Sequence, residues 1–308
     1  MAFTVGMTDA AAVDDSVILA YDQAFIVASA QEQIMDQFAT YKASINAKSI
    51  QFAKYPQLAL ATTPLDEDDD ISSVALSDSQ IILTPAEYGN VVTTTKLAAL
   101  QTGGVADLAA ARLVGINMAR TMDKLAILAL DASTNTITPG GAAEAALVAG
   151  DIMTASFLNQ VYNKLARESV TPIVEGMYAM VMHDDVIFDL RNSAGAGSWS
   201  DINKYARPEQ VLKNEVGMLS GFRIIRDNHS TLTADAGAAN VDTYRSYAIG
   251  FNAFGKAEAQ APQMVMAGPF DKLQRFVNIG WKSCVQYKIV DQDALYMAIT
   301  ASSVGANV

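Results

Sequence analysis

The sequence feature that most constrains the fold is a long stretch of strand-forming residues interrupted by a block of five acids. Residues 49–61 look extended, and the β-branched runs 79–84 and 90–95 follow the block. Together they predict a long, bent hairpin, each arm of which would reach about 33 Å at about 3.3 Å per residue. A two-stranded ribbon of that length is marginally stable alone in water, so we expect another surface to cover it. The acids at its tip are Asp66, Glu67, Asp68, Asp69 and Asp70.

This acidic block does not follow the pattern of a calcium-binding loop. Such a loop needs alternating ligands, a central glycine and a distal glutamate, and residues 66–70 have none of that spacing. A solvated turn is the simpler interpretation. We therefore predict no metal site at the tip of the hairpin.

His183 and the acids that follow it contain the residue types of a metal or general-base site. An imidazole near Asp184, Asp185 and Asp189 can bind a divalent cation or accept a proton near neutral pH. These residues also follow the apolar run 177–182, where capping of a helix is the simpler interpretation. A metal-dependent hydrolase that uses His183 and Asp185 stays open as an alternative function.

Asp227, His229 and Ser230 contain the residue types of a catalytic triad. Their closeness in sequence carries little weight, because triads assemble in space and no G-x-S-x-G turn accompanies them. A polar turn is the simpler interpretation. Cys284 lies in an apolar predicted strand, where a buried small hydrophobe is more typical than a nucleophile. No glycine loop for a dinucleotide or a phosphate occurs, so we expect neither an enzyme nor a cofactor.

The composition indicates a chain that buries surface against other chains. Hydrophobic residues make up 51% of the 308 residues and charged residues 18%, whereas average domains contain about 25% charged residues. Permanent subunit interfaces use such an excess of apolar surface. The net charge of -12 argues against sequence-specific binding of nucleic acid, because that binding depends on Lys and Arg at the phosphates.

The single cysteine excludes an intramolecular disulfide and a cysteine-based zinc site. This fits folding in a reducing cytoplasm. The first residues lack the basic segment and the continuous apolar segment of a signal peptide. Because no run of about 18 apolar residues occurs, we expect no membrane partner.

The clearest predicted helix runs from about residue 104 to residue 130 and would be about 40 Å long at about 1.5 Å per residue. Gly115 lies within its apolar stripe, where a glycine costs about 1 kcal/mol relative to alanine. Its presence therefore suggests that another backbone approaches closely. The predicted apolar face comprises Leu108, Ala111, Gly115, Met118, Met122, Leu125 and Ala129, and the residues that fall mostly outside it are Arg112, Asn117, Arg120, Asp123 and Lys124.

Helices and strands do not alternate regularly along the chain, which favours an α+β fold over a doubly wound sheet. Three- and four-residue spacing predicts a helix over 16–42, which would dock on a partner surface or on the chain's own core. Ser156 is the expected N-cap of another helix over 156–169. Further strands are expected at 177–182, 222–226 and 244–249, and a terminal strand pair at 276–290 and 294–301.

Four motifs in a fixed order carry a resemblance to a known family. They are LTPAEYGNVVTTTKLAAL at 83–100, GFRIIRDN at 221–228, AIGFNAFGKAE at 248–258 and GPFDKLQRFVNIGWKSCVQYKIV at 268–290. With the arm, the hairpin and the long helix, this order resembles a tailed-phage major capsid protein with the HK-97-like fold. The amino-acid sequences of these motifs are similar to those of the subgroup typified by the capsid protein of phage N-four.

The resemblance implies a division of the chain into four parts. Residues 1–45 would form an N-terminal arm, and residues 46–97 would form the extended E-loop that lies on a neighbouring subunit. Residues 98–150 and 270–308 would form the peripheral domain around the long spine helix. Residues 151–269 would form the axial domain, which meets its copies at the centres of hexamers and pentamers.

The function implied by the resemblance is structural. The chain would assemble with itself into an icosahedral phage head that encloses double-stranded DNA without reading its sequence. It would be a virion component assembled in the host cytoplasm, with a portal protein and possible scaffolding or decoration proteins as partners. The sequence shows no long charged N-terminal segment of the kind that some relatives use as a built-in scaffold, so we expect a separate scaffolding protein, or none. An encapsulin-like compartment shell is an alternative of the same fold.

The resemblance also assigns roles to particular residues. The acids at 66–70 would contact basic groups of the adjoining subunit, with Arg112, Arg120 and Lys124 as candidates. The packing of the peripheral domain would depend on Leu108, Gly115, Met118, Met122 and Trp281.

Overall fold

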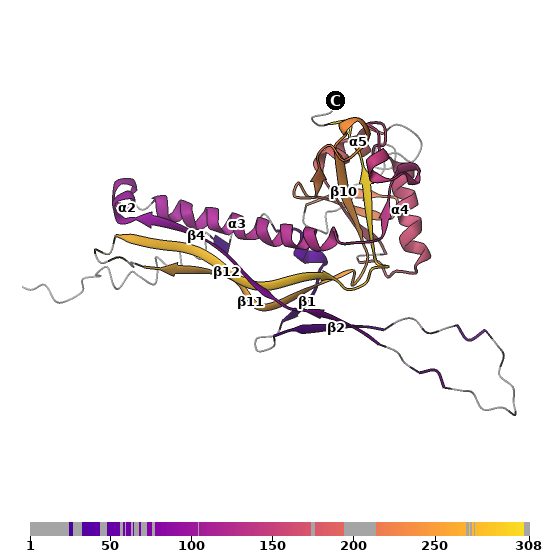
Figure 1. Cartoon of the computed structure of the whole chain (residues 1–308), viewed down its shortest axis with the longest axis horizontal. Helices are drawn as coiled ribbons and strands as arrows, with labels where there is room; N and C mark the ends of the chain where they lie inside the picture. Colours follow the sequence, from indigo (N-terminus) through magenta and orange to yellow (C-terminus); the bar gives the residue numbers. More distant parts are fainter. Residues whose placement is uncertain are drawn as a thin grey trace, which may run out of the picture.

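The long helix and two separate sheets organise the molecule, which we describe from a computed structural model. Figure 1 shows the long helix lying along a ribbon of strands, with a sheet-and-helix unit at one end of that ribbon. The predicted α+β class is confirmed by this arrangement. The structure describes residues 25–26, 33–43, 48–55, 58, 60–62, 64, 68, 73–75, 78–103, 105–173, 176–193, 214–268, 271, 273 and 275–304.

A four-stranded sheet forms the ribbon under the spine helix. Its order is β1-β11-β12-β4, with β1 parallel to β11 and the other neighbours antiparallel. The long strands β11 and β12 pair from Phe254 opposite Ile289 to Ala267 opposite Asn278. The bounds are β1 Thr40–Ala43, β4 Ala86–Thr95, β11 Phe254–Ala267 and β12 Phe276–Ile289.

The spine helix α3 (Val105–Leu130) packs on this sheet, chiefly on β12 and β4. A short helix, α2 (Lys96–Thr102), joins β4 to it. Trp281 of β12 donates a hydrogen bond from Nε1 to Oδ1 of Asn117 at 3.0 Å, which ties the sheet to the helix. The predicted helix over 104–130 is thus confirmed. No described helix has the length and apolar character needed to cross a membrane.

A seven-stranded sheet forms the second unit, in the order β5-β13-β10-β6-β8-β7 with β9 beside β10. Helices α4 (Ala155–Arg167) and α5 (Asp184–Asn192) contribute apolar side chains to its core. The strands are β5 Thr136–Ile137, β6 Tyr178–Met182, β7 Glu215–Leu219, β8 Phe222–Arg226, β9 Leu232–Thr233, β10 Thr243–Ile249 and β13 Leu295–Thr300, and the 3₁₀ turns are η1 Met35–Phe38, η2 Pro139–Gly141, η3 Glu144–Ala146 and η4 Ala238–Asn240.

The predicted hairpin exists, and among its described residues only the base is paired. Strand β2 (Ile50–Lys54) pairs antiparallel with β3 (Ser79–Leu83) over five residues each, and Figure 1 shows this pair leaving the two larger sheets. Beyond the pair, Leu60 is 87% exposed. The run 90–95, predicted as part of the hairpin, belongs instead to β4 and pairs with β12.

Three other sequence predictions are wrong in the structure. The terminal strands do not pair with each other, because β12 lies in the four-stranded sheet and β13 pairs with β10. The helix predicted to reach residue 42 gives way to β1, whose backbone pairs with the edge of β11. The N-cap of α4 is Thr154 rather than Ser156, and its hydroxyl accepts from the backbone N–H of Phe157 at 3.2 Å.

The buried face of the spine helix agrees with most of the residues predicted to pack there. Met118, Met122 and Trp281 are buried in the main core, and Gly115 is also buried. Leu108 is the exception, with 46% of its surface exposed. At that end of the helix Ala110 and Ala111 make the contact with Ile279 of β12, so Leu108 is not needed to fill the interface within the chain.

Candidate functional site

The residues proposed for a hydrolase serve structural purposes in the fold. His183 caps α5, because its Nδ1 lies 3.2 Å from the backbone N–H of Asp185 and accepts from it. Tyr244 donates to Oδ2 of Asp185 at 2.9 Å. Asp189 is directed elsewhere and accepts from Ser302 Oγ at 2.8 Å. Among the described residues no group of three or more His, Cys, Asp or Glu could hold a metal ion.

The residues with triad chemistry form the predicted polar turn. The carboxylate of Asp227 accepts from the backbone N–H of His229 at 2.8 Å and lies 3.2 Å from its Nδ1. This hydrogen bond raises the pKa of His229. The hydroxyl of Ser230 is buried and has no hydrogen-bond partner within the described part of the chain, so the arrangement does not activate a nucleophile.

The three basic residues proposed to meet acids of a neighbour lie on the solvent side of the spine helix. Arg112, Arg120 and Lys124 are all exposed. Lys124 Nζ lies 3.3 Å from Thr231 Oγ1 and donates to it. Arg120, Lys124 and His229 border an open hollow of about 490 Å³. Of the five acids, Asp68 is exposed, and Asp66, Glu67, Asp69 and Asp70 lie outside the described residues.

Large apolar side chains are exposed at the end of the ribbon that is distant from the second unit. Leu100 of α2 is 80% exposed, and Leu97 and Val105 are exposed beside it in sequence. On the sheet, Val91, Val265 and other apolar residues border a shallow hollow of about 320 Å³. Exposed apolar groups of this kind mark surfaces that contact other molecules when they gather in a patch.

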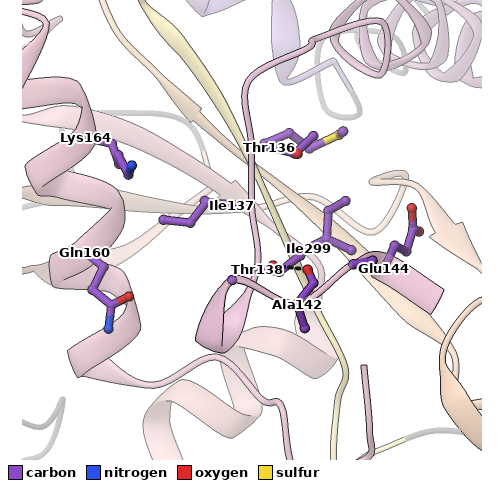
Figure 2. A pocket seen from close by; sticks show the side chains of 11 residues that line it. Thr136, Ile137, Thr138, Ala142, Glu144, Gln160, Lys164 and Ile299 are labelled. Carbon is purple, nitrogen blue, oxygen red and sulfur yellow. Dashed lines mark hydrogen bonds between the residues drawn. The ribbon is translucent and has the colours of Figure 1, made fainter. Parts of the chain in front are cut away.

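A polar hollow of about 510 Å³ lies between α4 and the segment from β5 to η3. Figure 2 shows Gln160 and Lys164 on one side and Glu144 on the other. The carboxylate of Glu144 is already engaged by Thr243 Oγ1 at 2.8 Å and by Arg245 at 3.6 Å. The hollow therefore presents one lysine and one amide, which is a poor set for catalysis.

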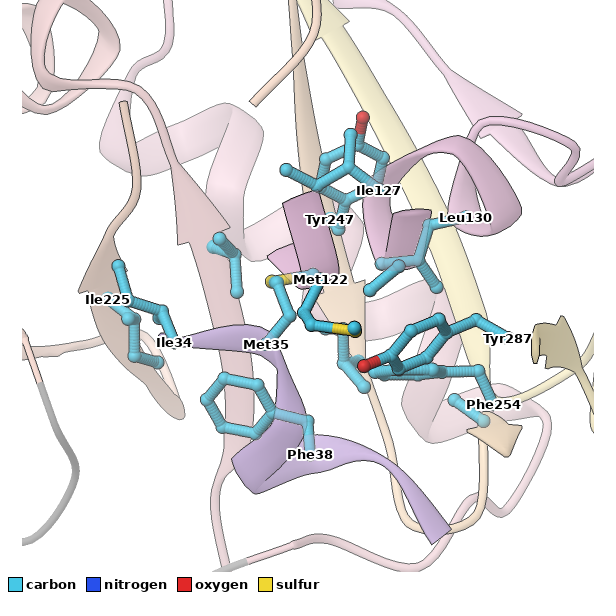
Figure 3. Close-up of a cluster of buried hydrophobic side chains, with 14 of the residues drawn as sticks. Ile34, Met35, Phe38, Met122, Ile127, Leu130, Ile225, Tyr247, Phe254 and Tyr287 are labelled. Atoms are coloured by element: carbon cyan, nitrogen blue, oxygen red, sulfur yellow. The ribbon is translucent and has the colours of Figure 1, made fainter. Parts of the chain in front are cut away.

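The described residues of the N-terminal arm pack into the main core. Met35 and Phe38 are buried against the spine helix and the sheets, and Figure 3 shows them beside Met122 and Tyr287. The carbonyl oxygen of Phe25 lies 2.6 Å from where a Cβ on Gly115 would be. The close backbone approach predicted from Gly115 is confirmed, and the approaching backbone is the arm.

A buried ionic cluster holds this arm to the sheet. Lys256 Nζ lies 2.5 Å from Asp36 Oδ2 and 3.2 Å from Glu258 Oε2. Tyr287 donates from its hydroxyl to Asp36 Oδ1 at 2.5 Å. Burial alone would lower the pKa of Lys256, but the carboxylates of Asp36 and Glu258 more than offset burial and raise it. Lys256 is therefore charged throughout the physiological pH range.

Asp123 is the buried polar residue that sequence reasoning missed. The helical spacing predicts it outside the apolar face, yet it is fully buried and accepts from the backbone N–H groups of Ile34 and Met35. The sequence does contain an indication that Asp123 is buried. Its neighbours on the helix surface, Ala119, Ala126 and Ile127, are all apolar and form one face with it. A charge within an apolar face indicates a specific partner.

Comparison with known proteins identifies the fold. No protein-family model matches the chain, and no curated protein matches its sequence. Among solved structures, the capsid of Ralstonia phage GP4 matches with a TM-score of 0.72 at 15% identity, over 88% of each chain. The capsid of cyanophage Pam1 matches with a TM-score of 0.65 at 14% identity, over 86% of this chain and 89% of that one. A virus-like particle from Pyrococcus furiosus gives 0.58 at 11% identity, over 92% of this chain and 99% of that one.

These matches extend over most of both chains in each pair. The chain therefore has the HK-97-like fold of phage capsid proteins, as the resemblance in its sequence implied. At such low identity the likeness establishes the architecture and leaves the function to be argued from the surfaces described above.

Proposed function

We propose that this chain is a major capsid protein that assembles with itself into the hexamers and pentamers of an icosahedral phage head. The observation that carries the proposal is the HK-97-like architecture combined with a hairpin whose described residues pair only over the five positions of β2 and β3 at its base. The base of the hairpin packs on Ala257 and Val290 of its own chain, but the described apolar residues beyond it are exposed, and exposed apolar groups of this kind mark a surface that another molecule covers. A copy of the same chain, present in every shell, supplies the surface that would cover the hairpin.

The hairpin provides both apolar and charged groups for this contact. Leu58, Leu60 and Val74 are exposed where the hairpin extends beyond β2 and β3. The acids at 66–70 would face Arg112, Arg120 and Lys124 of the adjoining copy. Each exposed pair contributes only about 0.2 to 1 kcal/mol, so the charges guide register more than they supply strength. Because the same contact recurs in every subunit, these small free energies accumulate over the whole shell.

The sheets support a modified division into domains. We assign β11 to the peripheral domain, because it pairs with β12, and β13 to the axial domain, because it pairs with β10. This moves the boundaries predicted at 269 and 270 and leaves the E-loop centred on β2 and β3. The subgroup of phage N-four remains a prediction from the motifs.

The remaining parts of the proposal concern surroundings and partners. The chain would be a virion component, assembled in the host cytoplasm, with a portal and possible scaffolding or decoration proteins. Its net charge of -12 suits a container that encloses DNA without binding it tightly. We propose no enzymatic role, because His183 and Asp185 are engaged in capping and hydrogen bonding.

Electron microscopy of the purified full chain tests the proposal. We expect closed polyhedral particles in negative stain, with nucleic acid inside when they form in infected cells. A matched variant, in which residues 56–77 are replaced by a short Gly-Ser turn, keeps the β2–β3 pair and should fold with unchanged circular dichroism yet form no particles. Monomers alone, both in the purified chain at high concentration and in infected cells, would contradict the proposal, and particles filled with protein would favour the encapsulin-like alternative.

A further inference from the structure

The strand β4 forms one edge of the four-stranded sheet. It ends the order β1-β11-β12-β4, so that among the residues the structure describes no strand pairs with its outer side. Its ten residues pair with β12 without a register shift, from Ala86 opposite Val285 to Thr95 opposite Phe276. A long, regular and exposed edge of this kind is a template on which another strand can pair.

Backbone contacts show which residues of β4 direct their N–H and C=O groups away from β12. Lys96, just beyond the last pair of the ladder, donates its backbone N–H to the carbonyl oxygen of Arg275 at 2.8 Å. In an antiparallel ladder, residues that bond to the partner strand alternate with residues that point away from it. In agreement, the N–H of Val91 donates to the side chain of Asn90 at 2.9 Å rather than to β12. The residues whose backbone groups point outward are Glu87, Gly89, Val91 and Thr93.

The sequence protects the two edges of this sheet unequally. Natural sheets protect an edge by a short strand, by lysine, by proline or by a bulge. The opposite edge strand, β1, has four residues and includes Lys42. By contrast, β4 has ten residues, no proline and no bulge in its ladder, and its only charged residue is Glu87. The edge at β4 is therefore the one that is able to pair.

Apolar side chains are exposed on both sides of this edge. Val91 is 56% exposed on the sheet face away from α3, and Val92 is 40% exposed on the face that α3 covers. Leu113 of α3 is 63% exposed and lies one turn before Asn117, which accepts a hydrogen bond from Asn90 of β4. Leu113 therefore lies on the β4 side of the helix. A strand added at this edge would reduce the exposure of these three apolar side chains.

We propose that the outer edge of β4 pairs with the same edge of a second copy, antiparallel and centred on Val91, so that one sheet continues through both subunits. The inference rests on the function proposed above, because it requires copies of the chain to meet. Charge complementarity favours this pairing. The exposed Glu87 would lie opposite Thr95 and next to the exposed Lys96 of the other copy, at each end of the pair. Parallel pairing in register would instead place Glu87 against Glu87.

The spacing of the strands leaves room for the second copy. The two-fold axis of such a pair is perpendicular to the sheet, so both spine helices would lie on the same face. Neighbouring strands are about 4.8 Å apart, which places the two β12 strands, with two β4 strands between them, about 14 Å apart. Packed helices need about 8 to 10 Å between their axes. Because α3 packs chiefly on β12, the two helices fit side by side, each with Leu113 on the side that faces the other.

Cysteine cross-linking of particles assembled from the full chain tests this pairing. Val91→Cys is combined with Cys284→Ser, so that the new thiol is the only one in the chain, and the particles are then oxidised. Directly opposed residues of an antiparallel pair have Cα atoms about 5.5 Å apart, within the range of about 4.4 to 6.8 Å that a disulfide spans. We expect covalent dimers on a non-reducing gel.

Thr93→Cys with the same Cys284→Ser change is the matched control. Thr93 would lie opposite Gly89, about 14 Å along the strand from its own counterpart, so this variant should stay monomeric on the gel. Hydrogen exchange of the unmodified protein is a second measurement. The peptide that contains residues 86–95 should exchange more slowly in particles than in the free subunit, because the outward amides gain partners.

The outcomes separate this inference from the function proposed above. Particles in which the Val91→Cys variant stays monomeric, or in which the Thr93→Cys variant forms as much dimer, overturn the β4 pairing and leave the shell function standing. Slower exchange at 86–95 without the cross-link through Val91→Cys would mean that another segment covers the edge, which also overturns the pairing. Chains that never associate overturn both.

Discussion

Replacing Gly115 with alanine tests whether the arm lies across the spine helix. On an open helix the change would raise the free energy of unfolding by about 1 kcal/mol, because glycine is the poorer helix former. Here the new Cβ would lie 2.6 Å from the carbonyl oxygen of Phe25 and 3.2 Å from its Cα. Both are backbone atoms, so only a shift of the arm relieves the clash.

The two effects have opposite signs, and their sizes decide the outcome. Overpacking of this kind costs about 1 to 3 kcal/mol. Subtracting the gain in helix propensity predicts that the free energy of unfolding falls by up to about 2 kcal/mol. Urea unfolding followed by circular dichroism measures the change.

Two controls make this result specific to the arm. Gly150→Ala places a Cβ where no atom lies within 4 Å, and it should change the free energy of unfolding by less than about 0.5 kcal/mol. In a chain shortened by residues 1–32 the clash is gone, and Gly115→Ala should then stabilise by about 1 kcal/mol. Stabilisation of that size in the full chain would refute the packing of Phe25 on the helix.

Three further predictions concern charge and exposed apolar surface. Changing the acids at 66–70 to their amides should slow assembly measured by light scattering and reduce its dependence on salt; unchanged kinetics at low salt would contradict the role of these acids. Leu100→Asp should alter the free energy of unfolding by less than about 0.5 kcal/mol but raise the concentration at which particles form, and unaffected assembly would exclude this surface. Lys256→Met should destabilise the subunit by about 3 kcal/mol, because it leaves the carboxylates of Asp36 and Glu258 without their cation. A fall of less than about 1 kcal/mol in thermal or urea unfolding would show that the cluster is not a stabilising one.

The spacing of apolar residues was sufficient to predict those helices and strands whose structure depends mainly on their own residues. The spine helix begins and ends within a residue of the predicted positions because its apolar spacing is sustained over seven turns. Gly115 was informative because glycine weakens a helix, so that its place in an apolar stripe indicates a neighbouring backbone too close for a side chain. The strand 178–182 was recognisable as an apolar run, and the strand 222–226 was recognisable from Phe222, Ile224 and Ile225, which alternate with or lie between its two arginines.

The errors concern contacts between distant segments. Nothing in residues 276–300 indicates that β12 and β13 enter different sheets, because their partners β4 and β10 lie far away in sequence. The helical spacing near residues 35–42 was overridden by the free edge of β11. Asp123 was misplaced because a carboxylate on a helix normally faces water, and its partners lie on an arm 88 and 89 residues earlier.

A zero-length cross-link between subunits is the most direct test of the central claim that the hairpin lies on another copy. Particles are assembled from a mixture of light and heavy isotope-labelled chains, and a carbodiimide joins carboxylates to nearby lysine amines. We expect cross-links of mixed isotope between the acids at 66–70 and Lys124. Cross-links of those acids to lysines within a single chain only would mean that the hairpin folds back on its own subunit, which contradicts the proposed contact between copies.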